Sequence, residues 1–305
     1  MNENATRVIA LAILLGTFVF CLTACSAQSS VAGTNPNAEI NHNYEAFIVS
    51  CSDSIEGADH EIEMPIWQQG HYTDDTAKKV ITKTINNETV QGEYLYTQKM
   101  LPNSFDRHFY RATSGSAIFF FLDDAGTLQY CTWDRRNTDP ERTATCTEEE
   151  CLAIAKDFIR TDVLKDINFD QYTVETSVDD DSGLYRFSFY KYIKGHKTTE
   201  EAHISVTKNG ELYSFGSFMF GKISEEDFVE FDSEKVAQVI DKKLDAVYKN
   251  VRNGSGTVTY DKKKMFYTLL EDGEPALYCV VTVKFTLPAG NGSMVREELL
   301  GLIIK

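Results

Sequence analysis

Apolar residues recur at helical spacing in the segment that begins at Thr147. Thr147 and Glu150 form a capping-box pattern, which is typical of the first turn of a helix. The apolar positions that follow predict an amphipathic helix over residues 148–162, and they are Cys151, Ala155, Phe158 and Ile159. Alternation of apolar and polar residues then predicts four strands, near 172–174, 185–189, 204–206 and 212–220, with the hairpin turn Asn209-Gly210 before the last.

A second stretch of similar length has the same order of elements. Asp232 and Ser233 are both suited to cap a helix, and either fits its start. An apolar stripe predicts that this helix runs to about Lys249, and its members are Val236, Ile240, Leu244 and Val247. Strands are expected over 265–270, 277–285 and 298–304, with Asp272-Gly273 as the turn between the first two. Cys279 lies on the apolar face of the long strand and is expected to be a small buried hydrophobe.

The segment from Thr147 to about Gly221 resembles the PepSY-like modules of exported bacterial proteins, which include thermolysin-type protease propeptides and spore-germination membrane proteins. The residues that carry the resemblance are the helix 148–155, the strand Tyr185-Arg186-Phe187 and the strand–turn–strand ending 206–212. Residues 236–305 match more loosely, because their ending has no clear counterpart of the Asn-Gly turn. The resemblance implies a cystatin-like helix-on-sheet fold and suggests binding or inhibition of a protease. It carries no functional residue over to this chain.

The region from residue 44 to residue 143 has a less regular pattern. Strands are expected over 90–96, 117–122 and 128–132, with the turn Asp124-Ala125-Gly126 between the last two. Residues 74–85 fit a short helix, although Thr82 and Thr84 weaken that interpretation because β-branched residues are poor helix formers. We expect a third, more divergent α+β unit here, followed by a linker over 135–142 that contains Pro140.

The N-terminus has the pattern of an export signal. Val8–Leu22 is uncharged, and its fifteen residues would rise only about 22 Å as a helix, which is short of the roughly 30 Å hydrocarbon core and typical of a signal peptide. Leu22-Thr23-Ala24-Cys25 looks like the lipobox of bacterial lipoproteins, which implies that Cys25 receives a diacylglyceryl group. The alternative is an incidental cysteine after an ordinary signal peptide. Ser26–Glu39 is polar, small and Gly/Pro-containing, so we expect a flexible tether.

Together these patterns predict an α+β fold of tandem modules, each with one helix packed on a three- to four-stranded antiparallel sheet. The predicted divisions are a lipoprotein signal peptide over 1–24, a tether over 25–43, the divergent N-terminal unit over 44–143, and PepSY-like modules over 144–224 and 225–305. The predicted location is the extracytoplasmic face of the cell membrane, where membrane lipid is a partner through Cys25.

Composition narrows the classes of partner. The 305 residues include 30 basic and 46 acidic side chains, for a net charge of −16. This balance argues against binding nucleic acid, because a phosphate-backbone binder needs a basic surface. At 42% apolar and 25% charged residues, the composition is that of an ordinary globular protein.

Seven cysteines are present, of which Cys21 and Cys25 belong to the signal region. The other five are an odd number for an oxidising compartment. They are Cys51, Cys131, Cys146, Cys151 and Cys279. Cys146 and Cys151 flank the start of the first predicted helix. A disulfide between them requires Cα atoms about 4.4–6.8 Å apart, so the bonded and free states both stay open.

No pattern for metal, cofactor or catalysis emerges from the sequence. The six histidines have no paired spacing, and there is no Gly-x-Ser-x-Gly elbow or Gly-rich phosphate loop. Residues 179–183 resemble the first half of a calcium loop, but Tyr190 stands where a bidentate Glu is required, so a charged hairpin turn is expected. Residues 60–63 are expected to be a solvated acidic loop.

Three functional hypotheses follow. The first is a binding or regulatory protein that contacts an envelope protease or another exported protein. The alternative is a lipoprotein that binds a small solute or glycan, which needs a pocket with convergent polar groups. The third is an enzyme whose site assembles from distant residues. The aromatic runs 119–121 and 213–220 place rings on both faces of their strands, which fits either packing within the chain or a partner-binding patch.

Overall fold

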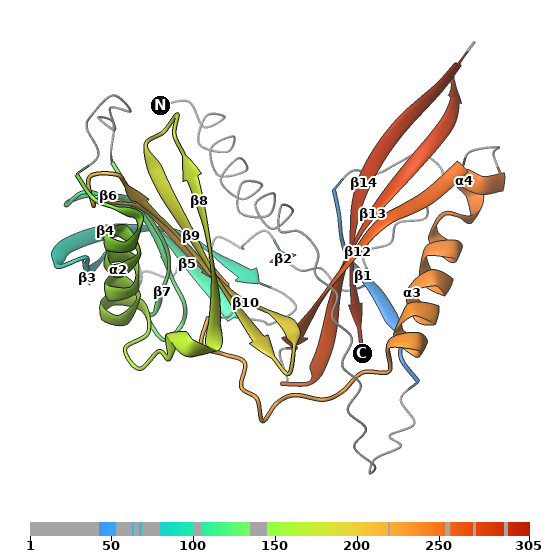
Figure 1. Ribbon diagram of the computed structural model, residues 1–305, viewed down its shortest axis with the longest axis horizontal. Coiled ribbons are helices and arrows are strands. Elements are labelled where there is room, and N and C mark those ends of the chain that lie inside the picture. The colour runs from blue at the N-terminus through green and yellow to red at the C-terminus, as the bar shows by residue number, and fades with distance from the viewer. Residues whose placement is uncertain are drawn as a thin grey trace. The chain divides into compact units, whose positions relative to one another are not determined.

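Backbone hydrogen bonds link fourteen strands of the described residues into one mixed sheet (Figure 1). The computed structural model describes residues 43–52, 63, 67–68, 80–100, 105–134, 145–218, 220–253, 257–270, 273–289 and 292–305. The strands are β1 (Ala46–Cys51), β2 (Trp67–Gln68), β3 (Val80–Ile85), β4 (Glu88–Met100), β5 (Phe105–Ala112), β6 (Ala117–Leu122), β7 (Leu128–Trp133), β8 (Tyr172–Asp179), β9 (Leu184–Ile193), β10 (His196–Thr207), β11 (Leu212–Phe218), β12 (Thr257–Leu269), β13 (Pro275–Ala289) and β14 (Gly292–Ile304). The helices are α2 (Glu148–Phe158), α3 (Ser233–Val247) and α4 (Lys249–Asn253), with a π turn over Ile159–Val163 and a 3₁₀ turn over Phe169–Gln171.

The order of strands contradicts the expected tandem modules. It runs β1-β14-β13-β12-β10-β11-β7-β6-β5-β4-β2, with β3 beside β4 and with β9 and β8 branching from β10. Strands expected in separate sheets therefore pair directly: β7 with β11 in antiparallel fashion, and β10 with β12 in parallel. The prediction of one helix on each small sheet is wrong, because the periodicity of a segment shows which face is buried and not which distant edge it pairs with. The predicted domain boundaries remain predictions.

Strand β10 pairs with different neighbouring strands in different parts of its length. Its residues 201–207 lie between β9 and β11, whereas Thr198 pairs with Tyr267 of β12. Thr198 lies in a bulge between Lys197 and Glu201, and β9 pairs with β10 on both sides of this bulge. Thr199 Oγ1 donates to Thr268 Oγ1 at 2.8 Å across the junction with β12. One long strand thus serves two sets of neighbours.

Helix α2 begins where the capping box predicts. The Thr147 hydroxyl accepts from the Glu150 backbone N–H at 3.3 Å, and the Glu150 carboxylate accepts from the Thr147 backbone N–H at 2.7 Å. The backbone N–H and the hydroxyl of Thr147 both donate to this carboxylate and lower the pKa of Glu150. The predicted apolar stripe is buried. The helix packs into the first hydrophobic core together with residues of β6, β7, β9, β10 and β11.

Helix α3 belongs to a second hydrophobic core. Asp232 is its cap and accepts from the backbone N–H groups of Glu234 and Lys235 at 3.0 and 3.1 Å. The apolar stripe predicted for this helix is buried against β1, β13 and β14. Cys279 is fully buried on β13, so its expected role as a small hydrophobe is confirmed.

The strands predicted between residues 90 and 132 are confirmed as β4, β6 and β7. The short helix expected over 74–85 is wrong for Val80–Ile85, which form β3, while residues 74–79 lie outside the described residues. Asn86 and Asn87 have φ angles of 52° and 60° and make the turn to β4; Asn is among the residues that tolerate this conformation. The β-branched residues that weakened the helix are the residues a strand favours.

Several rings of the aromatic runs lie in the hydrophobic cores. Phe120 and Phe215 are completely buried in the first core, and Phe220 is buried there as well. Phe218 packs against the second core, and the Arg107 guanidinium lies 5.8 Å from the centre of its ring. Packing within the chain, one of the two alternatives considered for the aromatic runs, therefore accounts for these four rings.

Gly92 on β4 gives a direct test of this packing. A Cβ atom at Gly92 would lie 2.4 Å from Cζ of the Phe120 ring, so we expect Gly92→Ala to lower the free energy of unfolding by about 1–3 kcal/mol. The control is Gln91→Ala on the opposite, exposed face, which should change it by less than about 0.5 kcal/mol. Denaturant titration measures both, and equal midpoints for the two variants would contradict the described contact.

Candidate functional site

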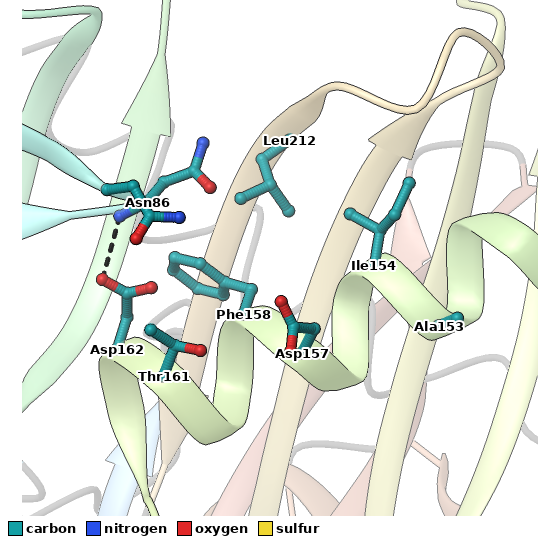
Figure 2. Close-up of a pocket in the computed structure, with 9 residues that line it drawn as sticks. Asn86, Ala153, Ile154, Asp157, Phe158, Thr161, Asp162 and Leu212 are labelled. Atoms are coloured by element: carbon teal, nitrogen blue, oxygen red, sulfur yellow. Dashed lines mark hydrogen bonds between the residues drawn. The ribbon is translucent and has the colours of Figure 1, made fainter.

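A pocket of about 310 Å³ opens between the β3–β4 turn and the C-terminal half of α2 (Figure 2). Its walls come from three separate parts of the chain: the turn, the helix with its π turn, and the first residue of β11. The lining residues are Asn86, Asn87, Ala153, Ile154, Asp157, Phe158, Thr161, Asp162 and Leu212. Apolar side chains and polar side chains therefore face the same space.

Local backbone geometry brings the polar groups together. The backbone N–H of Asn86 donates to Asp162 Oδ1 at 2.9 Å, which ties the β3–β4 turn to the end of the helix (Figure 2). Asp162 lies in the π turn, where the backbone N–H of Leu164 reaches back to the Ile159 carbonyl at 2.8 Å. Such wide turns change the direction of the side chains that follow a regular helix and are frequent at functional sites.

The pocket has an acidic edge and an apolar wall. Burial raises the pKa of Asp162, and the carboxylate of Asp157 adds to the rise, whereas the Asn86 N–H and the Lys83 ammonium oppose it. The buried side chains of Phe158 and Leu212 form the wall. Two carboxylates beside apolar surface suit a ligand with a positively charged head and an aliphatic or aromatic stem.

A chain of polar side chains runs across β4 and β5. The Tyr94 hydroxyl lies 2.6 Å from Thr97 Oγ1, which lies 2.8 Å from His108 Nδ1. His108 Nε2 lies 2.9 Å from Asp124 Oδ1. The order hydroxyl, imidazole, carboxylate is that of a catalytic triad, but the Asp124 side chain is 66% exposed, whereas a triad uses a buried carboxylate to orient the imidazole. We interpret this series of hydrogen bonds as holding the β6–β7 turn, which contains Asp124, against the sheet.

Glu200 on β10 is a carboxylate with no exposed surface. It accepts from the backbone N–H groups of Gly221 and Ile223 at 2.6 and 3.0 Å. The Tyr172 hydroxyl also donates to it, and Lys191 Nζ lies 3.4 Å from it. Burial and the charge of Glu200 raise the pKa of Tyr172, so the hydroxyl stays protonated and remains a donor. This cluster is buried, and its hydrogen bonds join β8, β9 and the segment after β11 to β10. We interpret its role as structural.

Cys25, the signal segment and the tether up to residue 42 lie outside the described residues. The structure brings Cys146 and Cys151 to the same end of α2 as free thiols, Cys146 half-buried and Cys151 buried. The predicted charged turn at 179–183 is confirmed: Asp179 accepts from Ser182 N–H at 3.0 Å and from Arg186 at 2.5 Å. Within the described ranges there is no cluster of three metal-ligating side chains and no helix long and apolar enough to cross a membrane.

Sequence reasoning missed both the pocket and the Glu200 cluster. The pocket joins residues 86–87, 153–162 and 212, and only long-range pairing shows that they are neighbours. The available signal was the dipeptide Asn86-Asn87 ahead of the strand pattern at 90–96, which predicts a tight turn and no ligand. Glu200 stands within a run of polar residues, Lys197–Glu201, that gives no indication of burial.

Comparison with known proteins leaves the family open. No family model and no curated protein matches the chain. Among solved structures, the chain is similar to the Bacillus megaterium YpeB C-terminal domain, with 12% sequence identity over 73% of this chain and 91% of that one, and a TM-score of 0.28. A TM-score at this level is too low to establish a common fold.

The Glu200 cluster predicts a large effect from a small change. Glu200→Gln keeps the shape but leaves the Lys191 ammonium without its buried countercharge, so we expect the free energy of unfolding to fall by about 3–5 kcal/mol. Glu226→Gln, at an exposed position, should change it by less than about 0.5 kcal/mol. Lys191→Met added to Glu200→Gln should recover part of the loss in urea titrations. Equal stabilities of Glu200→Gln and the parent protein would show that the carboxylate is not needed.

Proposed function

We propose that this protein is an exported lipoprotein, anchored to the cell membrane through Cys25, that acts as a binding or regulatory module toward another exported protein. In this proposal it performs no catalysis of its own, and its contact with the partner includes a basic side chain held in the pocket beside α2. The membrane anchor places the folded part at the extracytoplasmic face, where an envelope protease is one candidate partner.

The N-terminal sequence supports the anchor. An uncharged segment of signal-peptide length ends at Leu22-Thr23-Ala24-Cys25, and a polar tether follows. One acyl chain gives only marginal membrane binding, so the proposal implies at least two chains on Cys25. The PepSY-like pattern of residues 148–212 agrees with a regulatory role, and that resemblance remains a proposal.

The pocket is the observation that carries the binding function. Asp157 and Asp162 supply negative charge at its edge, and Phe158 and Leu212 supply apolar surface. A lysine or arginine side chain has the matching parts, since it joins an aliphatic stem to a cationic head. The net charge of −16 favours the approach of a basic partner in the same way.

A small solute or glycan is the second candidate occupant. The amides of Asn86 and Asn87 and the hydroxyl of Thr161 offer donors and acceptors of the kind that sugar hydroxyls use, beside the Phe158 ring. The volume of about 310 Å³ is at the lower end of the range for small-molecule sites. A neutral solute would depend little on the charge of the two aspartates, which separates the candidates.

The anchor is tested by metabolic labelling. We expect labelled palmitate to enter the protein in a bacterial host, and Cys25→Ser to abolish both the label and the cleavage of the signal peptide. Cys21→Ser is the matched control, since Cys21 lies four residues earlier and should leave labelling intact. Normal processing of Cys25→Ser would contradict the lipid anchor.

The pocket is tested with acetyl-lysine methylamide, which presents the lysine side chain, and with the norleucine analogue, which lacks the charge. NMR titration of the protein should detect the lysine compound binding at least about tenfold more tightly than norleucine, because a charge-assisted hydrogen bond contributes about 1.5–3 kcal/mol. Asp157→Asn and Asp162→Asn should each remove most of that preference. Asp166→Asn, an exposed acid outside the pocket, should leave it unchanged.

Binding of a cation in the pocket should depend on pH in a defined direction. A cation requires ionised carboxylates, and the pKa of Asp162 is raised, so binding should weaken on acidification at a higher pH than an ordinary aspartate would give. Equal binding of the lysine and norleucine compounds would contradict the cationic occupant. Tight binding of a neutral sugar, unaffected by Asp162→Asn, would favour the second candidate.

A further inference from the structure

Two cysteines occupy a pair of positions at the start of α2 whose side chains pack together. Cys146 directly precedes the cap residue Thr147, and Cys151 is the fourth residue of the helix. Apolar side chains at these two positions commonly contact each other and fix the direction in which the chain enters the helix. With cysteine at both positions, the same packing brings two sulfur atoms together.

Both cysteines also contact one hairpin turn, residues 207–210. The Cys146 backbone N–H donates to the Lys208 carbonyl at 3.0 Å, and the Cys151 thiol donates to the Thr207 carbonyl at 3.5 Å. Gly210 has φ 82°, and a Cβ atom there would lie only 2.9 Å from Cys146 Sγ. The turn thus holds both residues, and a glycine leaves room for the Cys146 sulfur.

The two thiols differ in their access to solvent. Cys151 is completely buried, whereas Cys146 is half-buried. Burial raises the pKa of Cys151 to about 11, and the neighbouring Cys146 contributes to the rise through its charge and a hydrogen bond between the thiols. Cys146 is therefore the sulfur that an external reagent reaches first, and Cys151 is placed to react with it afterwards.

We propose that Cys146 and Cys151 form a disulfide that locks the first turn of α2 when the protein is in an oxidising compartment. The oxidising compartment is inferred from the proposed export. The ability of the two thiols to form a disulfide does not depend on that proposal. The Cys146 thiolate attacks a disulfide-bearing oxidant and releases one of its thiols. The Cys151 thiolate then displaces the second thiol from Cys146 Sγ. The two cysteines lose two protons and two electrons, and the oxidant is reduced to two thiols.

The test uses the full chain equilibrated with mixtures of reduced and oxidised glutathione, followed by alkylation of free thiols. Trypsin cleaves after Arg142 and Lys156, so both cysteines and no others are in the peptide 143–156. In oxidised glutathione this peptide should be lighter by two hydrogen atoms than the dithiol and take no alkyl group. In reduced glutathione it should take two. The thermal unfolding midpoint should be about 4–8 °C higher in the oxidised state.

Two variants make the result specific. Cys146→Ser should abolish both the mass difference and the redox-dependent shift of the midpoint, whereas Cys51→Ser, at another half-buried cysteine, should keep both. Alkylation of both cysteines in excess oxidised glutathione would overturn the proposal, as would a midpoint shift that survives Cys146→Ser. If the disulfide forms here while Cys25 takes up no palmitate in cells, the proposed export fails and the dithiol assignment stands.

Discussion

A carboxylate that is buried away from water needs hydrogen-bond donors within the protein. Glu200 is such a carboxylate, and it lies near the middle of this sheet. It lies within the bulge of β10, between Thr198, which pairs with β12, and Glu201, where pairing with β11 begins. Its partners come from three directions: the Tyr172 hydroxyl at the start of β8, Lys191 on β9, and the backbone at Gly221 and Ile223. The chain that leaves β11 toward α3 is therefore fixed by the donors that one buried charge requires.

The second core contains a comparable arrangement. Glu298 on β14 is buried and accepts from the Tyr248 hydroxyl and from the Cys51 thiol, each at 3.0 Å. Burial and the charge of Glu298 raise the pKa of Tyr248. A buried charge gives little net stability compared with apolar side chains of the same size, but it is costly in any arrangement that leaves it unpaired. We infer that both glutamates favour the observed arrangement of the chain over arrangements in which their charges would be unpaired.

Local elements could be predicted from the sequence, and their long-range pairing could not. The capping box at Thr147, the apolar stripe ending at Val247 and the turn at Gly210 each follow from residues close together in the chain, and each is present. The pairing of β7 with β11 depends on edges some eighty residues apart, and alternation is the same whichever edge is chosen. For that reason strands with clear alternation, such as β9 and β13, were predicted, while their division into separate sheets was wrong. No strand was predicted at β1 or β5, and β3 was expected to be helical.

Helix α2 links the two proposals made for this protein. Its first turn carries the dithiol, and the pocket begins at Ala153 and ends in the π turn that follows the helix. Eleven residues of α-helix span only about 16 Å, and the buried face is packed against one core throughout. A bond that fixes the entry of the helix therefore restricts the position of Asp157 and of the wall formed by Phe158. A binding site gains affinity when its groups are held before the ligand arrives, because less conformational entropy is lost on binding. The oxidised state proposed here would give the pocket that advantage in the compartment where the partner is expected.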